Sequence, residues 1–259
     1  MDISALKSKL RGSALWKDIE HRKEIGSTNE GIRALAEKGA PGGIVIVSDI
    51  QTGGKGRLGR KWESPKGGLW FSFLLRPRML PGSAPVITLM AGAAVAKALR
   101  ALYKIDARVK WPNDILIDGR KVCGILSEAS AQGGKLDFAI VGIGINANND
   151  ARALRLERPI AQPVSVKDLV NREVDIPELL AGVLQAIERE YALVRDGKTD
   201  KVLSDWSSLS DTIGKRVEIM DAGARLMGMA KGIAADGALV LETESGDVIV
   251  NSGDCRYME

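Results

Sequence analysis

The stretch ILIDGRKVCGIL, residues 115–126, contains two apolar runs separated by Asp118 and Gly119. An Asp-Gly pair between such runs predicts a type I′ β-hairpin, because these residues tolerate the positive φ that both central positions of this turn need. Other β-branched or aromatic runs predict further strands, at residues 44–47, 69–75, 108–111 and 138–143. The sheet that these strands form is therefore expected to be at least partly antiparallel.

Helical patterns separate the predicted strands. Residues 83–103 are rich in Ala, Leu and Val, with apolar positions near helical spacing, and predict a buried central helix. Ser27, followed three residues later by Glu30, predicts a capping box that starts a helix ending at Gly39. Residues 179–191 predict an amphipathic helix. Because strands outnumber helices and are joined partly by hairpins, we expect an α+β fold with a mixed or mainly antiparallel sheet.

The last part of the chain has a different pattern. Four short strand patterns separated by turn residues occur at 216–220, 225–233, 238–242 and 247–251. Strands at this spacing are typical of a small barrel. We therefore expect two domains, a large one over residues 1–211 and a small all-β domain over residues 212–259.

Composition limits the class of protein. Of the 259 residues, 45% are hydrophobic and 27% are charged, which is typical of a soluble globular protein. The longest apolar stretch, from Val86 to Leu99, is interrupted by Lys97 and is shorter than the roughly 20 residues that a membrane-spanning helix needs. The charged first residues do not form a signal peptide. We expect a cytoplasmic protein with no membrane partner.

Few residues could bind a metal or act as a nucleophile. The chain contains two cysteines, Cys123 and Cys255, and one histidine, His21, so a structural zinc site is not expected. His21 has no serine or cysteine motif beside it, and we expect it to have a structural role in a strand or on the surface. Cys123 lies in an apolar run and is expected in the core.

The most informative segment is GGKGRLGRKW, residues 53–62. It satisfies G-x-G-x-x-G, but the WESPKGG of residues 62–68 cannot open the helix that a dinucleotide fingerprint requires. Gly54 and Gly59 have the spacing of the P-loop glycines, but a P-loop is excluded, because Arg60 and Lys61 occupy the positions where its Lys and its Ser or Thr would stand. Five basic residues and one acidic residue between positions 55 and 66 give +4, the whole net charge of the chain. Glycine N–H groups and cations predict a polyphosphate-binding loop, and a solvated basic loop is the alternative.

Three other segments are candidates for a site. KWPND, residues 110–114, groups a cation, an amide and a carboxylate at a strand end, although an ordinary strand exit has the same pattern. Lys121 lies inside an apolar strand and is either an edge residue facing solvent or a ligand to a carboxylate or phosphate. GIGIN, residues 142–146, ends a core strand with glycines that permit close approach and with the amide of Asn146.

These segments occur in order with STN, residues 27–29, and RKVCGILSE, residues 120–128. In this combination the chain resembles the biotin protein ligases (biotin–[acetyl-CoA-carboxylase] ligases) from about residue 20 to its end. The resemblance implies a mixed-sheet catalytic domain similar to class II synthetases and a C-terminal SH3-like barrel. Only about 20 residues precede the catalytic segment, too few for the helix-turn-helix of the variant that represses transcription. We therefore expect the monofunctional form, without a DNA partner.

The resemblance implies a two-step reaction. Biotin and ATP give biotinyl-5′-AMP and pyrophosphate, and the biotinyl group then passes to a lysine of a biotin carboxyl carrier protein. ATP, Mg²⁺ and biotin are the implied cofactors and substrates. Such a reaction needs no activated Ser, Cys or His, since the carboxylate of biotin itself attacks the α-phosphate.

The resemblance also implies roles for individual residues. The implied biotin contacts are Ser27, Thr28, Asn29, Gln51, Gly54, Lys55, Gly56, Arg57, Trp62, Lys121 and Gly124. The implied contacts to ATP or the adenylate are Lys55, Arg57, Arg60, Trp62, Lys110, Asn113, Asp114 and Asn146. The implied catalytic residues are Arg57, Lys110 and Asp114, and Asp114 is also the implied metal ligand.

The basic loop departs from the family's GRGRRGR-like pattern at Lys55 and Leu58, each of which replaces an arginine. Lys55 keeps the charge but loses the bidentate geometry. Two alternatives stay open. A lipoate protein ligase has a related fold but no ureido ring for residues 27–29 to recognise, and a non-catalytic nucleic-acid-binding module has no use for residues 27–29 or 110–114. The resemblance also leaves open a homodimer formed through an exposed sheet.

Overall fold

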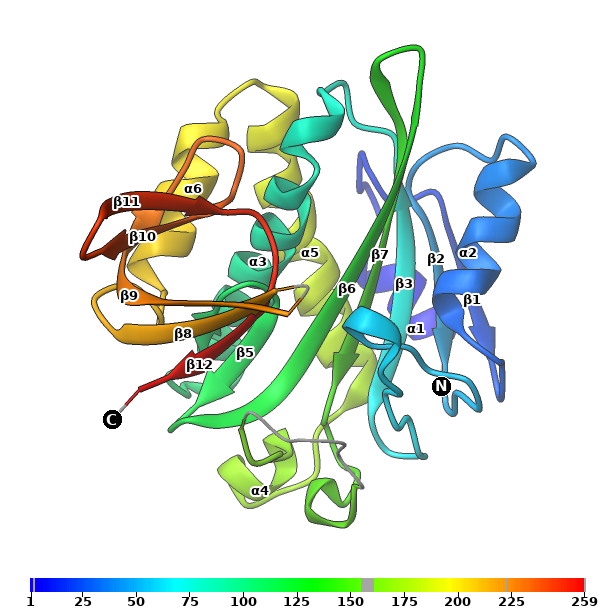
Figure 1. The fold of residues 1–259 in the computed structure, drawn as a ribbon. Coiled ribbons are helices and arrows are strands. Elements are labelled where there is room, and N and C mark those ends of the chain that lie inside the picture. The colour runs from blue at the N-terminus through cyan, green and yellow to red at the C-terminus, as the bar shows by residue number, and fades with distance from the viewer. Residues whose placement is uncertain (2, 155–160, 222, 259) are drawn as a thin grey trace.

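The computed structural model describes the chain except for residues 2, 155–160, 222 and 259, and its strands form two sheets (Figure 1). The larger sheet has seven strands in the order β1-β2-β3-β7-β6-β5-β4, in which β1 and β2 are parallel and all other neighbours are antiparallel. The smaller sheet has five antiparallel strands in the order β11-β10-β9-β8-β12. The predicted α+β class with a mixed sheet is confirmed.

The strands of the larger sheet all lie before residue 146. They are β1 (Asp18–Arg22), β2 (Ile44–Ser48), β3 (Leu69–Leu75), β4 (Arg108–Lys110), β5 (Asp114–Ile117), β6 (Arg120–Gln132) and β7 (Lys135–Ile145). The smaller sheet contains β8 (Arg216–Asp221), β9 (Ala224–Ile233), β10 (Leu239–Thr243), β11 (Gly246–Val250) and β12 (Asp254–Tyr257). The α-helices are α1 (Ile3–Lys9), α2 (Thr28–Glu37), α3 (Pro85–Tyr103), α4 (Val166–Val170), α5 (Ile176–Arg195) and α6 (Thr199–Ser208). The sequence patterns do not predict α6 or β12.

Two hairpins shape the larger sheet. Asp118 and Gly119 have φ values of 50° and 71° and join β5 to β6, so the predicted type I′ turn is confirmed. Gly133 and Gly134, with φ values of 59° and 73°, join β6 to β7 in an arm that projects at the top of Figure 1. This arm carries both strands beyond their expected ends, because its residues 127–137 are mostly polar or small and give no clear strand pattern.

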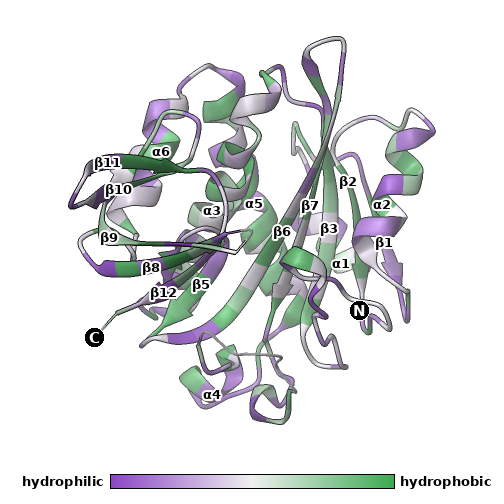
Figure 2. Cartoon of the chain, viewed as in Figure 1, coloured by the Kyte–Doolittle hydropathy of each residue, from purple (hydrophilic) through white to green (hydrophobic). Residues whose placement is uncertain are grey.

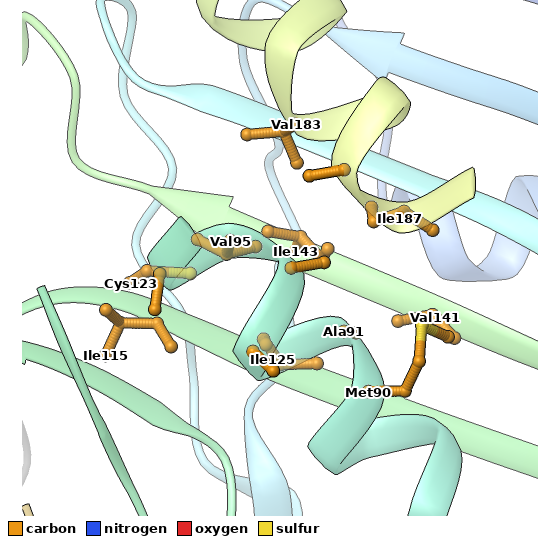
Figure 3. Close-up of a cluster of buried hydrophobic side chains, with 14 of the residues drawn as sticks. Met90, Ala91, Val95, Ile115, Cys123, Ile125, Val141, Ile143, Val183 and Ile187 are labelled. Atoms are coloured by element: carbon orange, nitrogen blue, oxygen red, sulfur yellow. The ribbon is translucent and has the colours of Figure 1, made fainter. Parts of the chain in front are cut away.

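The two faces of the larger sheet are covered by different layers. On one face α3 packs against the strands and α5 packs against α3, so that Met90 of α3 lies in one cluster with Ile125 of β6 and Val141 of β7 (Figure 3). The other face carries α2, which has both hydrophilic and hydrophobic residues along its length (Figure 2) and packs Ile32 into a cluster with Ile140. The central strands are buried from both sides, which explains their continuous apolar runs.

The expected buried central helix is confirmed as α3. The segment Pro81–Tyr103 is, among the described residues, the one helical stretch long and apolar enough to cross a membrane, with a mean hydropathy of 1.5. In the folded chain 67% of its most apolar window is buried, and the helix lies in the core between the sheet and α5. A core helix of a soluble protein has the same composition as a spanning helix, because both avoid water.

The start of α2 is predicted correctly, but the capping box is wrong. Ser27 occupies the N-cap position, yet its side chain makes no capping hydrogen bond to any described residue. Glu30 pairs instead with Lys55, whose Nζ lies 2.5 Å from Oε1. Ser27 is buried, with 3% of its surface exposed. A tertiary partner for Glu30 has therefore replaced the local capping interaction.

The smaller sheet packs closely on the rest of the protein. Val109 of β4 donates a backbone hydrogen bond to Leu209 at 3.0 Å and accepts one from Asp211 at 2.8 Å. Buried residues of the smaller sheet, such as Val217 and Leu241, belong to the same apolar cluster as α3. The packing of the smaller sheet brings β12 close to the end of β4. The domain boundary predicted between residues 211 and 212 stays a prediction.

Candidate active site

A cleft is lined by both sheets, by the start of α2, by the loop between β2 and β3, and by residues 110–114. It brings together most of the predicted site residues: Ser27, Thr28, Asn29, Gln51, Lys55, Gly56, Arg57, Arg60, Trp62, Lys110, Asn113, Asp114, Lys121, Gly124 and Asn146. Of the described residues, Gly54 is the predicted one that does not line it. A Cβ at Gly54 would lie 2.4 Å from the carbonyl oxygen of Trp62, so this glycine lets the loop fold back on itself.

Buried hydroxyls and amides form a hydrogen-bonded network at one end of the cleft. Gln51 Oε1 accepts from the backbone N and the Oγ1 of Thr28, at 2.8 and 3.0 Å. Ser72 Oγ lies 2.6 Å from Thr28 Oγ1 and donates to Asn29 Oδ1 at 2.6 Å. Asn29 Nδ2 donates to Glu128 Oε2 at 2.7 Å. We call Ser27 together with these five residues the polar half of the cleft. Ser27, Thr28, Asn29 and Gln51 line the cleft, and the hydrogen bonds to Ser72 and Glu128 fix the orientation of Thr28 and Asn29.

Glycines on β6 and β7 give these side chains their space. A Cβ at Gly142 would lie 2.1 Å from Asn29 Oδ1, and one at Gly144 would lie 2.4 Å from Trp62 Nε1. A Cβ at Gly124 would lie 2.9 Å from the same indole ring. The glycines of residues 142–146 are therefore needed for the positions of Asn29 and Trp62, as the expected close approach at this strand end requires.

The basic loop is a small closed turn. Gly56 N donates to Arg60 O at 2.7 Å, and Trp62 N donates to Gly54 O at 2.9 Å. Leu58, at its tip, has a φ of 56° and is 67% exposed. Lys55 is also exposed, and its hydrogen bond to Glu30 raises the pKa of its ammonium group. The loop thus places some of its cations toward solvent and others toward the cleft.

Arg57 and Arg60 face the smaller sheet. Arg57 Nη1 lies 3.3 Å from Asn113 Oδ1 and 3.3 Å from the carbonyl oxygen of Gly253, and burial lowers the pKa of its guanidinium. Arg60 binds the carboxylate of Asp254 through two nitrogens, with one contact at 3.1 Å, and this hydrogen bonding raises the pKa of Arg60. Residues at the start of β12 therefore hold both arginines.

Two lysines complete what we call the cationic half of the cleft: Arg57, Arg60, Lys110 and Lys121. Lys121 Nζ lies 2.6 Å from Asp114 Oδ1 and 5.1 Å from the centre of the Trp62 ring, so it is a ligand to a carboxylate rather than a solvent-facing residue. Lys110 is 3% exposed, and burial lowers the pKa of its ammonium group.

The two predicted asparagines hold the chain around the cleft. Asn113 Nδ2 donates to the carbonyl oxygen of Ile125 at 2.8 Å, and its Oδ1 accepts from Arg57. Asn146 is buried, and its Oδ1 accepts from Asn149 Nδ2 at 3.1 Å. KWPND is therefore more than an ordinary strand exit, because its lysine, asparagine and aspartate all line the cleft.

The sequence reasoning missed four residues that complete the site: Ser72, Glu128, Asp254 and Tyr257. Ser72 is a lone hydroxyl in an otherwise apolar strand, a signal that could have been noticed. Glu128 lies in the resembling segment but was not assigned a role. Asp254 and Tyr257 lie in the unpredicted β12 and contact the cleft cations only through the fold.

His21 and Cys123 take no part in the cleft. His21 lies in β1 and its Nε2 is 2.7 Å from Asp49 Oδ1, which confirms the expected structural role. Cys123 is fully buried, and burial raises the pKa of its thiol, so it stays protonated and inert. Nucleophilic catalysis by these side chains does not fit the structure.

Comparisons with known proteins agree with this geometry. Residues 23–146 match the biotin/lipoate A/B protein ligase family, and residues 212–256 match the biotin protein ligase C-terminal domain. The chain is 32% identical over 253 residues to the bifunctional ligase/repressor BirA of Bacillus spizizenii, covering 97% of this chain and 77% of that protein. It is 29% identical over 266 residues to the biotin–[acetyl-CoA-carboxylase] ligase of Mycobacterium tuberculosis, covering 100% of this chain and 96% of that protein.

A solved structure extends the likeness to the whole fold. The biotin protein ligase from Aquifex aeolicus, in complex with biotin and ATP, has a TM-score of 0.77 to this chain at 30% identity, covering 94% of this chain and 100% of that one. The fold, the cleft and the first family match define the class of biotin/lipoate A/B protein ligases. The C-terminal match and the relatives narrow the class further. The chain belongs to the biotin protein ligase family.

Proposed function

We propose that this chain is a biotin–[biotin carboxyl carrier protein] ligase, which forms biotinyl-5′-AMP from biotin and ATP and transfers the biotinyl group to a lysine of the carrier. One observation carries the proposal: a single cleft joins the polar half and the cationic half. Hydroxyls and amides with fixed donors and acceptors suit the cyclic urea of biotin. Clustered arginines and lysines suit the phosphates of ATP.

In the first step an oxygen of the biotin carboxylate attacks the α-phosphorus of ATP. A carboxyl–phosphate bond forms, the bond from the α-phosphorus to the bridging oxygen breaks, and pyrophosphate leaves. Both reactants are anions, so cations must offset their repulsion and the charge that grows on the phosphate oxygens. Arg57 and Lys110 supply these charges in a partly water-excluded cleft, and Lys121 orients the carboxylate beside Trp62.

Mg²⁺ accompanies ATP in this proposal. The described residues contain no group of three His, Cys, Asp or Glu side chains that could hold a metal alone. Asp114 offers one carboxylate, which also pairs with Lys121. Because Mg²⁺ commonly uses one or two carboxylates together with phosphate oxygens, Asp114 fits as the single protein ligand of an ion that arrives with the nucleotide. Such an ion would neutralise phosphate charge.

In the second step the neutral amine of the carrier lysine attacks the acyl carbonyl of the adenylate. An amide bond forms, the bond to the phosphate oxygen breaks, AMP leaves, and the amine releases a proton to water. The chain's contribution is to hold the adenylate between the glycine-rich loop and β6 and to keep it from hydrolysis. The name of the mycobacterial relative, a biotin–[acetyl-CoA-carboxylase] ligase, points to a carboxylase as the protein that bears the carrier.

The two alternatives are less well supported. The C-terminal family match and the relatives concern biotin, and lipoate has no ureido ring for the polar half. A nucleic-acid-binding loop would leave its cations unpaired, whereas Arg60 is bound to Asp254 and Lys55 to Glu30. These pairs reduce the free charge available to a phosphate backbone.

The proposal also covers the location, the partners and the oligomeric state of the enzyme. We propose a cytoplasmic location, no DNA partner, and a homodimer formed along the outer edge of β6. In support of the dimer, β5 pairs with β6 only as far as Gly124, although β6 runs to Gln132. An unpaired strand edge is a template for pairing with another chain. Sedimentation equilibrium with and without biotin tests this, and a monomer at all concentrations would contradict it.

The experiment that tests the main proposal is adenylation. The purified chain is incubated with Mg-ATP and either biotin or lipoate, while pyrophosphate release and the enzyme-bound acyl-adenylate mass are followed. Release that depends on biotin, with the mass of biotinyl-5′-AMP, is the expected result. Release with lipoate alone would assign the chain to the sister ligases, and release with neither acid would refute both activities.

A further inference from the structure

Lys110 differs from Arg60 and Lys121 in what balances its charge. Arg60 and Lys121 each bind a carboxylate, from Asp254 and Asp114 respectively. Within the described part of the chain, the ammonium of Lys110 forms no ion pair, although the residue is only 3% exposed. The ring of Tyr257 lies 4.5 Å from Lys110 Nζ, measured to the ring centre. An aromatic face at this distance attracts a cation without carrying a charge.

The ring of Tyr257 and the backbone beside Lys110 are tied to one threonine. Thr212 Oγ1 accepts a hydrogen bond from the backbone N of Trp111, the next residue after Lys110, at 3.0 Å. The same oxygen lies 3.4 Å from the hydroxyl of Tyr257. Tyr257 is also fixed by its strand, because it pairs with Val217 of β8. The distance from ring to ammonium is therefore set by the packing of the smaller sheet.

The aromatic contact does not neutralise the charge of Lys110. A carboxylate next to Lys110 would neutralise the ammonium and compete with a phosphate for it. A buried ammonium with no partner would be costly. The face of an aromatic ring offsets part of that cost and still leaves the full positive charge for an incoming anion.

We propose that Tyr257, on the last strand of the smaller sheet, is a positioning residue for adenylation whose ring holds the charged side chain of Lys110 in the cleft. The inference rests on the proposed function, since it takes Lys110 to act on the phosphates of ATP. It assigns the effect to the ring and not to the hydroxyl. The smaller sheet would thereby take part in the first chemical step, although Tyr257 itself touches no substrate.

The test compares variants that keep or remove the aromatic ring of Tyr257. Tyr257→Leu removes the aromatic face, and Tyr257→Phe keeps it but loses the hydroxyl. We expect Tyr257→Leu to lower kcat/KM for ATP about tenfold, which corresponds to ~1.4 kcal/mol and lies within the range for a buried cation–π contact. Tyr257→Phe should restore most of this loss. The control Lys215→Met removes a second cation, 4.2 Å from the same ring but paired with Asp211, and should change kcat/KM less than about twofold.

Two further measurements separate positioning from a structural role. The affinity for biotin without ATP should stay unchanged in Tyr257→Leu, because Tyr257 lies on the side of the cationic half. In a Lys110→Met background, Tyr257→Leu should cost nothing further, since the ring would have no cation to hold. If Tyr257→Leu fails to fold, pentafluorophenylalanine at position 257 keeps the shape of the ring while reversing its quadrupole, and should reproduce the tenfold loss.

The outcomes distinguish failure of this inference from failure of the proposed function. The inference is overturned if Tyr257→Phe loses as much as Tyr257→Leu, if the loss persists in the Lys110→Met background, or if biotin affinity falls in parallel. Wild-type chain that forms no adenylate with biotin would instead refute the proposed function, and this inference with it. Wild-type activity with unaffected Tyr257 variants would refute the inference alone.

Discussion

The polar half and the cationic half of the cleft are built in different ways. In the polar half, Thr28 and Asn29 find their partners on the larger sheet and its loops, at Gln51, Ser72 and Glu128. In the cationic half, three of the four cations rest on groups of the smaller sheet, which are the carbonyl of residue 253 and the side chains of residues 254 and 257. One half is complete within the larger sheet, whereas the other depends on the docking of the smaller one. Changes should therefore affect biotin and ATP separately.

The largest expected effect is in the polar half. Gly142→Ala places a Cβ only 2.1 Å from the present position of Asn29 Oδ1. Asn29 must therefore move, and it loses its hydrogen bonds to Ser72 and Glu128. The loss of one buried and one partly buried hydrogen bond predicts a loss in biotin affinity of about 100-fold. Isothermal titration calorimetry with biotin alone measures it. Gly232→Ala, at a strand glycine with open space around it, is the matched control. Affinity within threefold of wild type would contradict the role of Gly142.

Lys110 should limit the reaction at alkaline pH. Burial lowers its pKa below the ordinary 10.5; Cys255, Asp114 and Asp211 oppose this shift, and Lys121 adds to it. Because the charged form binds phosphate, kcat/KM for ATP should fall about tenfold per pH unit once the pH rises through that lowered pKa. In Lys110→Arg the guanidinium stays charged, so the descending limb should move to higher pH by at least about one unit. Identical limbs in both proteins would show that another group titrates.

A smaller effect is expected where the basic loop meets β12. Asp254→Asn removes the charge that holds Arg60 and should raise KM for ATP about fivefold, with biotin affinity unchanged. Asp247→Asn, which breaks the exposed pair with Lys231 on the same sheet, is the matched control and should have no effect. Steady-state kinetics with each substrate varied in turn makes the comparison. Equal losses for biotin and ATP would mean that the two halves are not independent.

The smallest effect is expected at Lys55. Its side chain is 57% exposed and is bound to Glu30 rather than to the groups of either half. Lys55→Gln should change KM for biotin and for ATP by no more than about twofold, as is usual for exposed ion pairs. The same steady-state assay measures it. A loss above tenfold would show that the loop rearranges to bring Lys55 onto a ligand.

Local signals predicted much of the fold and of the site. The turn at Asp118 and Gly119 follows from the φ values that only a few residues tolerate, and the glycine-rich loop follows from composition. Ser72 was missed because a single hydroxyl does not change the apolar pattern of β3. It becomes part of the site only because α2 packs against β3 and brings Asn29 next to it. The capping box failed because Glu30 found a tertiary partner.

The sequence by itself determined most of the secondary elements around the cleft, the family to which the chain belongs, and most residues that line the cleft. These follow from patterns among neighbouring residues. Only the tertiary structure decided that β12 holds the cations. Arg60 and Asp254 are 194 positions apart, and Lys110 meets Tyr257 only because the smaller sheet packs against β4. Electrostatic attraction depends on distance in space, so no local pattern in the sequence can encode it.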